Sequence, residues 1–143
     1  MSAPLRVLIP CDGSEPSGRA VAHAVGLAGR GLPIEIHVLN VQPAVRGGAA
    51  SLVSPRDRES YHRDEGMKVL AGALRQIEAA GLTPHAHVSV GDPGETIVAF
   101  AQRLQCDHVV MGTRGFGTVA NLLLGSAARH VVGHGVLPVT LVR

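Results

Sequence analysis

Short apolar segments alternate with amphipathic helical segments along the whole chain, and this alternation limits the fold more than any other feature. Leu5 to Ile9 is a short apolar run of the kind found in buried parallel strands. Ser17 to Arg30 then has alanines and valines at helical spacing and is closed by glycines. The pattern predicts strands at 5–9, 34–41, 85–90, 108–111 and 138–142, and helices at 17–30, 57–80, 95–104 and 126–132.

Five strands that alternate with helices predict an α/β protein with an open parallel sheet and helices on both faces. A chain of 143 residues suits one domain, and no long linker divides it. We therefore expect residues 1–143 to form a single domain. Residues 42–56 are rich in Pro, Gly, Ala and Ser and predict a long loop. Whether this loop forms a lid over a ligand or lies loose on the surface stays open.

The helix expected at 57–80 has apolar residues at helical spacing, which indicates the side that packs on the sheet. These residues are Met67, Leu70, Leu74 and Ile77. Gly81 follows the last of them and indicates where the helix stops.

The composition excludes several classes of protein. Hydrophobic residues make up 45% of the chain and charged residues 17%, which favours a packed core over disorder. Aromatic residues make up only 2%, and the basic residues form no stripe, so we expect no nucleic-acid partner. No apolar run approaches about 18 residues, and the N-terminus lacks a signal peptide, which predicts a cytoplasmic protein without a membrane span. Cys11 and Cys106 form no CxxC pair and are typical of buried thiols in a reducing compartment.

The loops that follow the strands are the candidate ligand site, because open parallel sheets bind ligands beyond the carboxyl ends of their strands. The first strand is followed by Pro10 to Ser14, and the second ends at Val41. The fourth strand is followed by the glycine-rich segment 112–117, and the chain then reaches Gly125-Ser126 at the start of the last helix.

Two common nucleotide motifs are absent from the sequence. The single lysine, Lys68, lies within a predicted helix, which excludes a Walker lysine, and no GxGxxG follows the first strand. The remaining pattern is Gly112-x2-Gly115-x9-Gly125-Ser126, with Arg114 as its cation. Its glycines let backbone amides approach an anion, and its final pair offers amides, a hydroxyl and a helix N-terminus to a phosphate.

With these motifs the sequence resembles the universal stress protein family over essentially its whole length. The segments that carry the resemblance are Val7 to Ser14, His37 to Val41, Val109 to Gly117, Gly125-Ser126 and Pro138 to Val142. The glycine motif marks the nucleotide-binding branch of that family. The resemblance implies a Rossmann-like sheet, similar to the adenine nucleotide alpha hydrolase-like folds, with strand order 3-2-1-4-5.

The resemblance also implies an adenine-nucleotide site. Asp12 would bind the ribose and help to place Mg²⁺, while Pro10, Cys11 and Val41 would surround the adenine. Gly112, Arg114 and Gly115 would hold the sugar and the first phosphates. The terminal phosphates would lie at Gly125, Ser126 and the following Ala127 and Ala128, and Met111 is a further expected nucleotide-binding residue. Many ATP-binding relatives have Val and then Ser or Thr where this chain has the two alanines, so ADP and AMP stay open as ligands beside ATP.

We therefore expect an ATP-binding regulatory switch with an unidentified protein partner. Turnover should be slow or absent, because the motifs supply no evident general base. The last strand, 138–142, should lie at a sheet edge, where a second copy would cover it in a homodimer. The alternative is a nucleotide-free interaction scaffold. An enzyme related to the adenylate-forming or pyrophosphatase folds is disfavoured, because their signatures are absent after the first strand.

Simpler interpretations accompany these predictions. The glycine loop is also compatible with a plain connection, and Asp12 with a helix cap or a turn. His85 and His87 on a strand, and His130 and His134 on a helix, have spacings compatible with metal binding. No carboxylate or Cys joins either pair in the sequence, so the pattern favours solvated or half-buried histidines.

Overall fold

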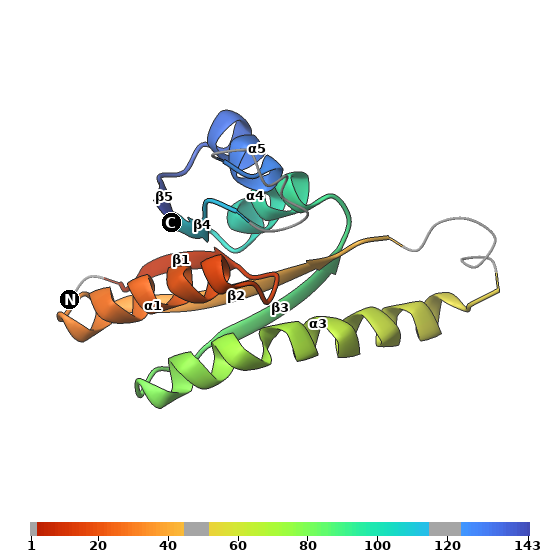
Figure 1. The fold of residues 1–143 in the computed structure, drawn as a ribbon, viewed down its shortest axis with the longest axis horizontal. Coiled ribbons are helices and arrows are strands. Elements are labelled where there is room, and N and C mark those ends of the chain that lie inside the picture. The colour runs from red at the N-terminus through yellow and green to blue at the C-terminus, as the bar shows by residue number, and fades with distance from the viewer. Residues whose placement is uncertain (1–2, 45–51, 115–123) are drawn as a thin grey trace.

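The computed structural model describes residues 3–44, 52–114 and 124–143, and its elements follow the expected alternation (Figure 1). They are β1 (Leu5–Pro10), α1 (Glu15–Gly29), β2 (Ile34–Gln42), α3 (Pro55–Ala79), β3 (His85–Val90), α4 (Pro93–Arg103), β4 (His108–Gly112), α5 (Ser126–His134) and β5 (Val139–Val142). Most ends differ from the expected ones by one or two residues. At α1, for example, the Ser14 hydroxyl caps the helix, so it begins at Glu15. Of the loop expected at 42–56, residues 45–51 lie outside the described part.

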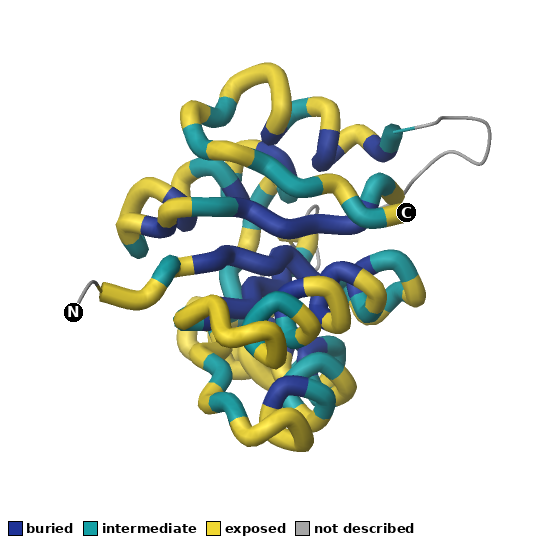
Figure 2. Tube along the Cα trace, turned by 90° about the vertical axis from the view of Figure 1, so that its left-hand side faces the viewer, coloured by how far each residue is buried: buried dark blue, intermediate teal, exposed yellow. Residues whose placement is uncertain are grey.

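The five strands form one parallel sheet in the order β3-β2-β1-β4-β5, which confirms the expected fold class and strand order. Helices α1 and α3 pack on one face, while α4 and α5 pack on the other. Figure 2 shows the central strands as the most buried part of the chain, as expected for a sheet covered on both faces. The carboxyl ends of β1 and β4 therefore lie side by side near the middle of the sheet, on the side where all five strands end.

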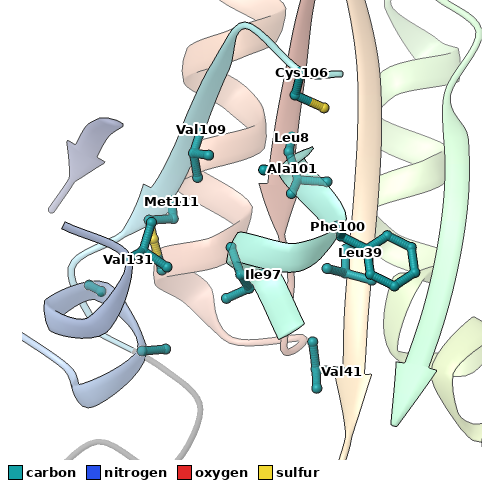
Figure 3. Packing of buried hydrophobic residues seen from close by; sticks show 12 residues of the cluster. Leu8, Leu39, Val41, Ile97, Phe100, Ala101, Cys106, Val109, Met111 and Val131 are labelled. Atoms are coloured by element: carbon teal, nitrogen blue, oxygen red, sulfur yellow. The ribbon is translucent and has the colours of Figure 1, made fainter. Parts of the chain in front are cut away.

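Successive residues of β1 supply two separate cores, because side chains alternate across a strand. Val7 and Ile9 pack with α1 and α3, whereas Leu8 points to the other face. Figure 3 shows that second core, in which Leu8 and Leu39 gather with Ile97 of α4 and neighbouring side chains. Burial of aliphatic side chains on both faces fixes the middle of the sheet, and with it the loops that follow β1 and β4.

One expectation about α3 is wrong. Met67 is 39% exposed, and the residues of this helix that are buried are His62, Gly66, Leu70 and Ile77. Gly66 faces Val88 of β3 so closely that an added Cβ would lie 2.4 Å from the Val88 Cγ1 atom. The helix therefore lies on β3 through its glycine, and the adjacent Met67 stays partly exposed where it lines a groove beside Val88 and Val90 of β3.

Candidate functional site

A pocket lies beyond the carboxyl ends of β1 and β4, at the point where the crossover direction of the sheet changes. Its described lining residues are Pro10, Asp12, Ser17, Met111, Gly112, Thr113, Arg114, Gly125, Ala127 and Ala128. These residues come from the ends of two neighbouring strands, from the first turn of α1 and from the start of α5. The sheet thus brings together segments that are about one hundred residues apart, since β1 pairs with β4 through Val7 and His108.

The loop between β1 and α1 forms one wall of the pocket. The Ser14 backbone amide donates a hydrogen bond of 2.9 Å to Asp12 Oδ1, which makes Asp12 a turn-forming residue as well as a lining residue. Gly13 has a φ of +81°, a conformation that favours glycine. The Ser14 hydroxyl accepts from the Ser17 amide at 3.4 Å and caps α1. Backbone geometry therefore holds the Asp12 carboxylate at the pocket.

The end of β4 forms the opposite wall and approaches α1 closely. A Cβ added to Gly112 would lie 2.8 Å from the Cβ of Pro16, so glycine is needed here for packing between β4 and α1. The next residue, Thr113, donates its amide to the Val142 carbonyl at 3.0 Å and accepts from the Gly125 amide at 2.6 Å. Thr113 thus joins the pocket to β5 and to the start of α5.

The N-terminus of α5 closes the pocket with backbone amides for which the described residues supply no side-chain cap. Gly125 occupies the N-cap position and provides no side-chain hydrogen bond, whereas Ser14, Ser54 and Asp92 cap the other described helices. Among the described residues, no side chain caps the first amides of α5, and the positive end of the helix dipole adds to their donor character. Such a helix end suits an anion such as a phosphate, a sulfate or a carboxylate.

Arg114 provides positive charge beside this helix end. Its exposed side chain also lines an adjoining groove with Arg19 and Arg143. Arg19 is held there by an ion pair with Glu15 (3.0 Å) and by a hydrogen bond from its Nε to the Arg143 carbonyl (2.6 Å). The side of the pocket toward α1 and β5 is therefore basic, which favours an anionic ligand with charge beyond the helix end.

Not every residue expected in the site lies in the pocket. The Cys11 side chain belongs to the core under α1 and α3, and the Val41 side chain packs in the opposite core. Asn40 donates to the Cys11 carbonyl at 2.8 Å and fixes the backbone there. Ser126 is exposed at the first position of α5, and Gly115 lies outside the described residues. Of the three residues expected around an adenine ring, Pro10 lines the pocket.

Burial also decides the chemistry of Cys11. Loss of water around the thiol and, to a smaller extent, the nearby Asp12 charge raise the pKa of Cys11 to about 12. Burial thus favours the protonated thiol at neutral pH, as is typical of a structural cysteine and not of a nucleophile.

Ser17 and Thr113 line the pocket although the sequence motifs did not point to them. Thr113 follows β4 directly, and its position after a strand was the available signal. Ser17 lies within the first turn of α1 and donates its hydroxyl to the Ser14 carbonyl at 2.9 Å. A serine in a first helical turn is common, so nothing in the sequence distinguished it.

The chain matches the model of the universal stress protein family over residues 5–143. It is 32% identical to universal stress protein MJ0531 of Methanocaldococcus jannaschii, over 96% of this chain and 81% of that protein.

Two solved structures are similar over nearly the whole chain. The hypothetical protein MJ0577 superposes with a TM-score of 0.77 at 26% identity, covering 96% of this chain and 94% of that chain. A universal stress protein in complex with cAMP superposes with a TM-score of 0.74 at 27% identity, covering 99% of each chain. Within the described residues, no helix has both the length and the apolar character needed to cross a bilayer.

Proposed function

The chain belongs to the universal stress protein family, and from this membership we propose that it is a cytoplasmic regulator that binds an adenine nucleotide in the pocket between β1, β4 and α5. ATP with Mg²⁺ is the favoured ligand, and ADP and AMP are the alternatives. The observation that carries the proposal is the N-terminus of α5, which no side chain of the described residues caps and which shares one pocket with Asp12 and Arg114. The similar structure that holds cAMP supports the choice of an adenine nucleotide.

The residues present suit the parts of such a ligand. The amides of the first turn of α5, with the Ser126 hydroxyl, suit a terminal phosphate, and Arg114 suits the phosphate charge. The Asp12 carboxylate suits a ribose hydroxyl or Mg²⁺. When bound, Mg²⁺ would neutralise part of the negative charge of the phosphates. Pro10 offers an apolar surface to the base.

Nucleotide retention fits this site better than turnover. Among the described lining residues, Asp12 and Arg114 are the ionisable side chains. Phosphoryl transfer needs a positioned nucleophile and several groups that neutralise the developing charge. We therefore propose that the bound nucleotide acts mainly as a signal for a protein partner.

We also propose that β5 pairs with a second copy to form a homodimer. Apolar side chains are exposed around this edge: Val136 is 79% exposed, Val132 51% and Leu141 37%. The opposite edge strand, β3, exposes one large apolar side chain, that of Val90, but also carries His85 and His87, and polar side chains on an edge strand oppose pairing between molecules. A two-fold pair through β5 would cover the apolar edge.

The first test is the identity of any nucleotide released when the purified protein is denatured, measured by mass spectrometry. Titration calorimetry with ATP and Mg²⁺ follows. A released adenine nucleotide, or binding heat, supports the proposal. Neither released nucleotide nor heat at millimolar ATP would leave the nucleotide-free scaffold. That alternative has one observation in its favour: Ala127 and Ala128 are buried in the core against α4, so their methyl groups serve packing.

Substitutions at Ser126 separate binding from stability. A carboxylate in Ser126→Asp would repel a phosphate, yet it would stabilise α5 by about 0.3–1 kcal/mol through the helix dipole. We expect this variant to bind ATP at least tenfold more weakly by calorimetry while its thermal midpoint holds or rises. Ser126→Ala, the matched control, should lose only one hydroxyl contact. Equal affinity in Ser126→Asp and wild type would show that α5 does not hold the phosphates.

A further inference from the structure

A second group of polar side chains lies on the half of the sheet formed by β2 and β3. Glu35 and His37 lie two residues apart on β2, and His85 and His87 lie two residues apart on β3. Side chains at this spacing point to the same face of a sheet. The strand register pairs His37 with His85 and Leu39 with His87, so all four polar side chains lie on the face that carries α4.

Three of these side chains converge closely enough to share one ion. One ligand atom from each of Glu35, His37 and His85 lies within 4.8 Å of the others. Glu35 Oε2 is 3.2 Å from His37 Nε2, and Glu35 Oε1 is 3.8 Å from His85 Nε2. Ligands at the usual zinc distances are roughly 3.4 Å apart around a tetrahedral ion. The present spacing therefore needs only small side-chain rotations to reach that geometry.

We propose that Glu35, His37 and His85 form a binding site for a divalent transition metal, with zinc as the best fit. Two imidazoles and one carboxylate are a ligand set that zinc accepts, whereas calcium and magnesium prefer oxygen ligands throughout. The side chain of His85 is 45% exposed, so one side of the site faces solvent and leaves room for a fourth ligand from water. The inference does not depend on nucleotide binding.

The neighbouring groups hold these ligands in place. His87 Nε2 lies 2.9 Å from His37 Nδ1, within hydrogen-bond distance, and metal-bound histidines commonly have such a partner on the second ring nitrogen. Arg6 Nε lies 2.8 Å from Glu35 Oε2 and fixes the carboxylate, while Glu35 Oε1 faces His85. The positive charge of Arg6 repels a metal ion bound at Glu35. We therefore expect zinc to bind more weakly here than in a structural zinc centre with four protein ligands.

A metal at this position would join the edge strand to its neighbour. Glu35 and His37 belong to β2, while His85 is the first residue of β3. An ion bound only by the folded protein raises its stability in proportion to the logarithm of ion concentration. Zinc should therefore raise the thermal midpoint of the protein progressively as its free concentration exceeds the dissociation constant.

The test uses the untagged protein after treatment with EDTA, titrated with ZnCl₂ against a chromophoric chelator. We expect one site, and Co²⁺ in its place should give the visible absorption of a four-coordinate ion. Glu35→Gln and His85→Ala should each lower zinc affinity at least tenfold and remove the zinc-dependent rise in thermal midpoint. Both side chains are partly exposed, and thermal melts without metal verify that the variants fold.

The matched control is His134→Ala. His134 stacks on His130 of α5 with ring centroids 4.2 Å apart. These two residues form the second histidine pair whose spacing in the sequence is compatible with metal binding. We expect this variant to bind zinc like the wild type. Wild-type affinity in both Glu35→Gln and His85→Ala, loss of binding in His134→Ala, or no binding by the wild type would each overturn the proposal. The cluster would then be a hydrogen-bonded network only.

Discussion

Cys11 shows how the surroundings of a single residue decide its chemistry. Cys11 directly precedes Asp12, a residue that lines the pocket. Its own side chain, however, is only 2% exposed, and its Sγ lies 3.5 Å from the Ile9 carbonyl oxygen. Burial, with a smaller contribution from Asp12, raises the pKa of the thiol to about 12. In the unfolded chain the same thiol would ionise near its ordinary value of 9.0.

This difference predicts a pH dependence of stability. Below about pH 9 the thiol is protonated in both states and the stabilisation is complete; as pH rises from 9 toward 12, only the unfolded state loses the proton. The free energy of unfolding should therefore fall with a slope of up to about 1.4 kcal/mol per pH unit from this thiol. Urea unfolding between pH 8.5 and 10.5 measures the slope, which Cys11→Ala should reduce. An unchanged slope in the variant would contradict the assignment.

Helix α3 shows what the spacing of apolar residues can predict at the scale of one element, and what it cannot. Leu70 and Ile77 were expected on the buried side and are fully buried. Met67 was expected there too, but the helix approaches β3 through Gly66. A hydrophobicity pattern ranks side chains by their apolar surface, so it cannot detect a contact made possible by the absence of a side chain.

The Gly66 contact gives a prediction for α3. Gly66→Ala places a methyl group against Val88 and should lower the free energy of unfolding by about 1–3 kcal/mol. Gly72→Ala, in the same helix, meets no atom nearer than Arg75 Nη2 at 4.0 Å and should raise it by about 0.5–1 kcal/mol. Chemical denaturation measures both values. A stabilised Gly66→Ala would mean that α3 lies farther from β3.

At the scale of the whole molecule, the sequence predicts the arrangement of the sheet well. Strand alternation and the family resemblance together predict the strand order, and the rule for parallel sheets places the pocket at the ends of β1 and β4. The group of Glu35, His37 and His85 was not predicted. Its members come from two strands, and they meet only because of the register between β2 and β3. Register between distant segments depends on the packed sheet and is not visible in local spacing.

The proposed homodimer is also tested at this scale. Leu141→Lys places a charge on the exposed side of β5 and should convert a dimer into a monomer, measured by light scattering after size-exclusion chromatography. Val90→Lys, on the opposite edge strand, is the matched control, because Val90 is exposed to a similar degree. A dimer that persists in Leu141→Lys, or that is lost in Val90→Lys, would place the interface elsewhere.

The central position of β1 has a consequence for how the protein is made. Arg6 donates its amide to the Asp107 carboxylate at 2.9 Å and accepts from the Asp107 amide at 2.8 Å, across 101 positions of sequence. On a ribosome, β1 and β2 can pair early, but the other side of β1 has no strand beside it until β4 has emerged. For most of its synthesis the nascent chain therefore exposes, as an open edge, the strand that later lies deepest in the sheet. We expect this interval to be the period in which the growing chain depends most on chaperones.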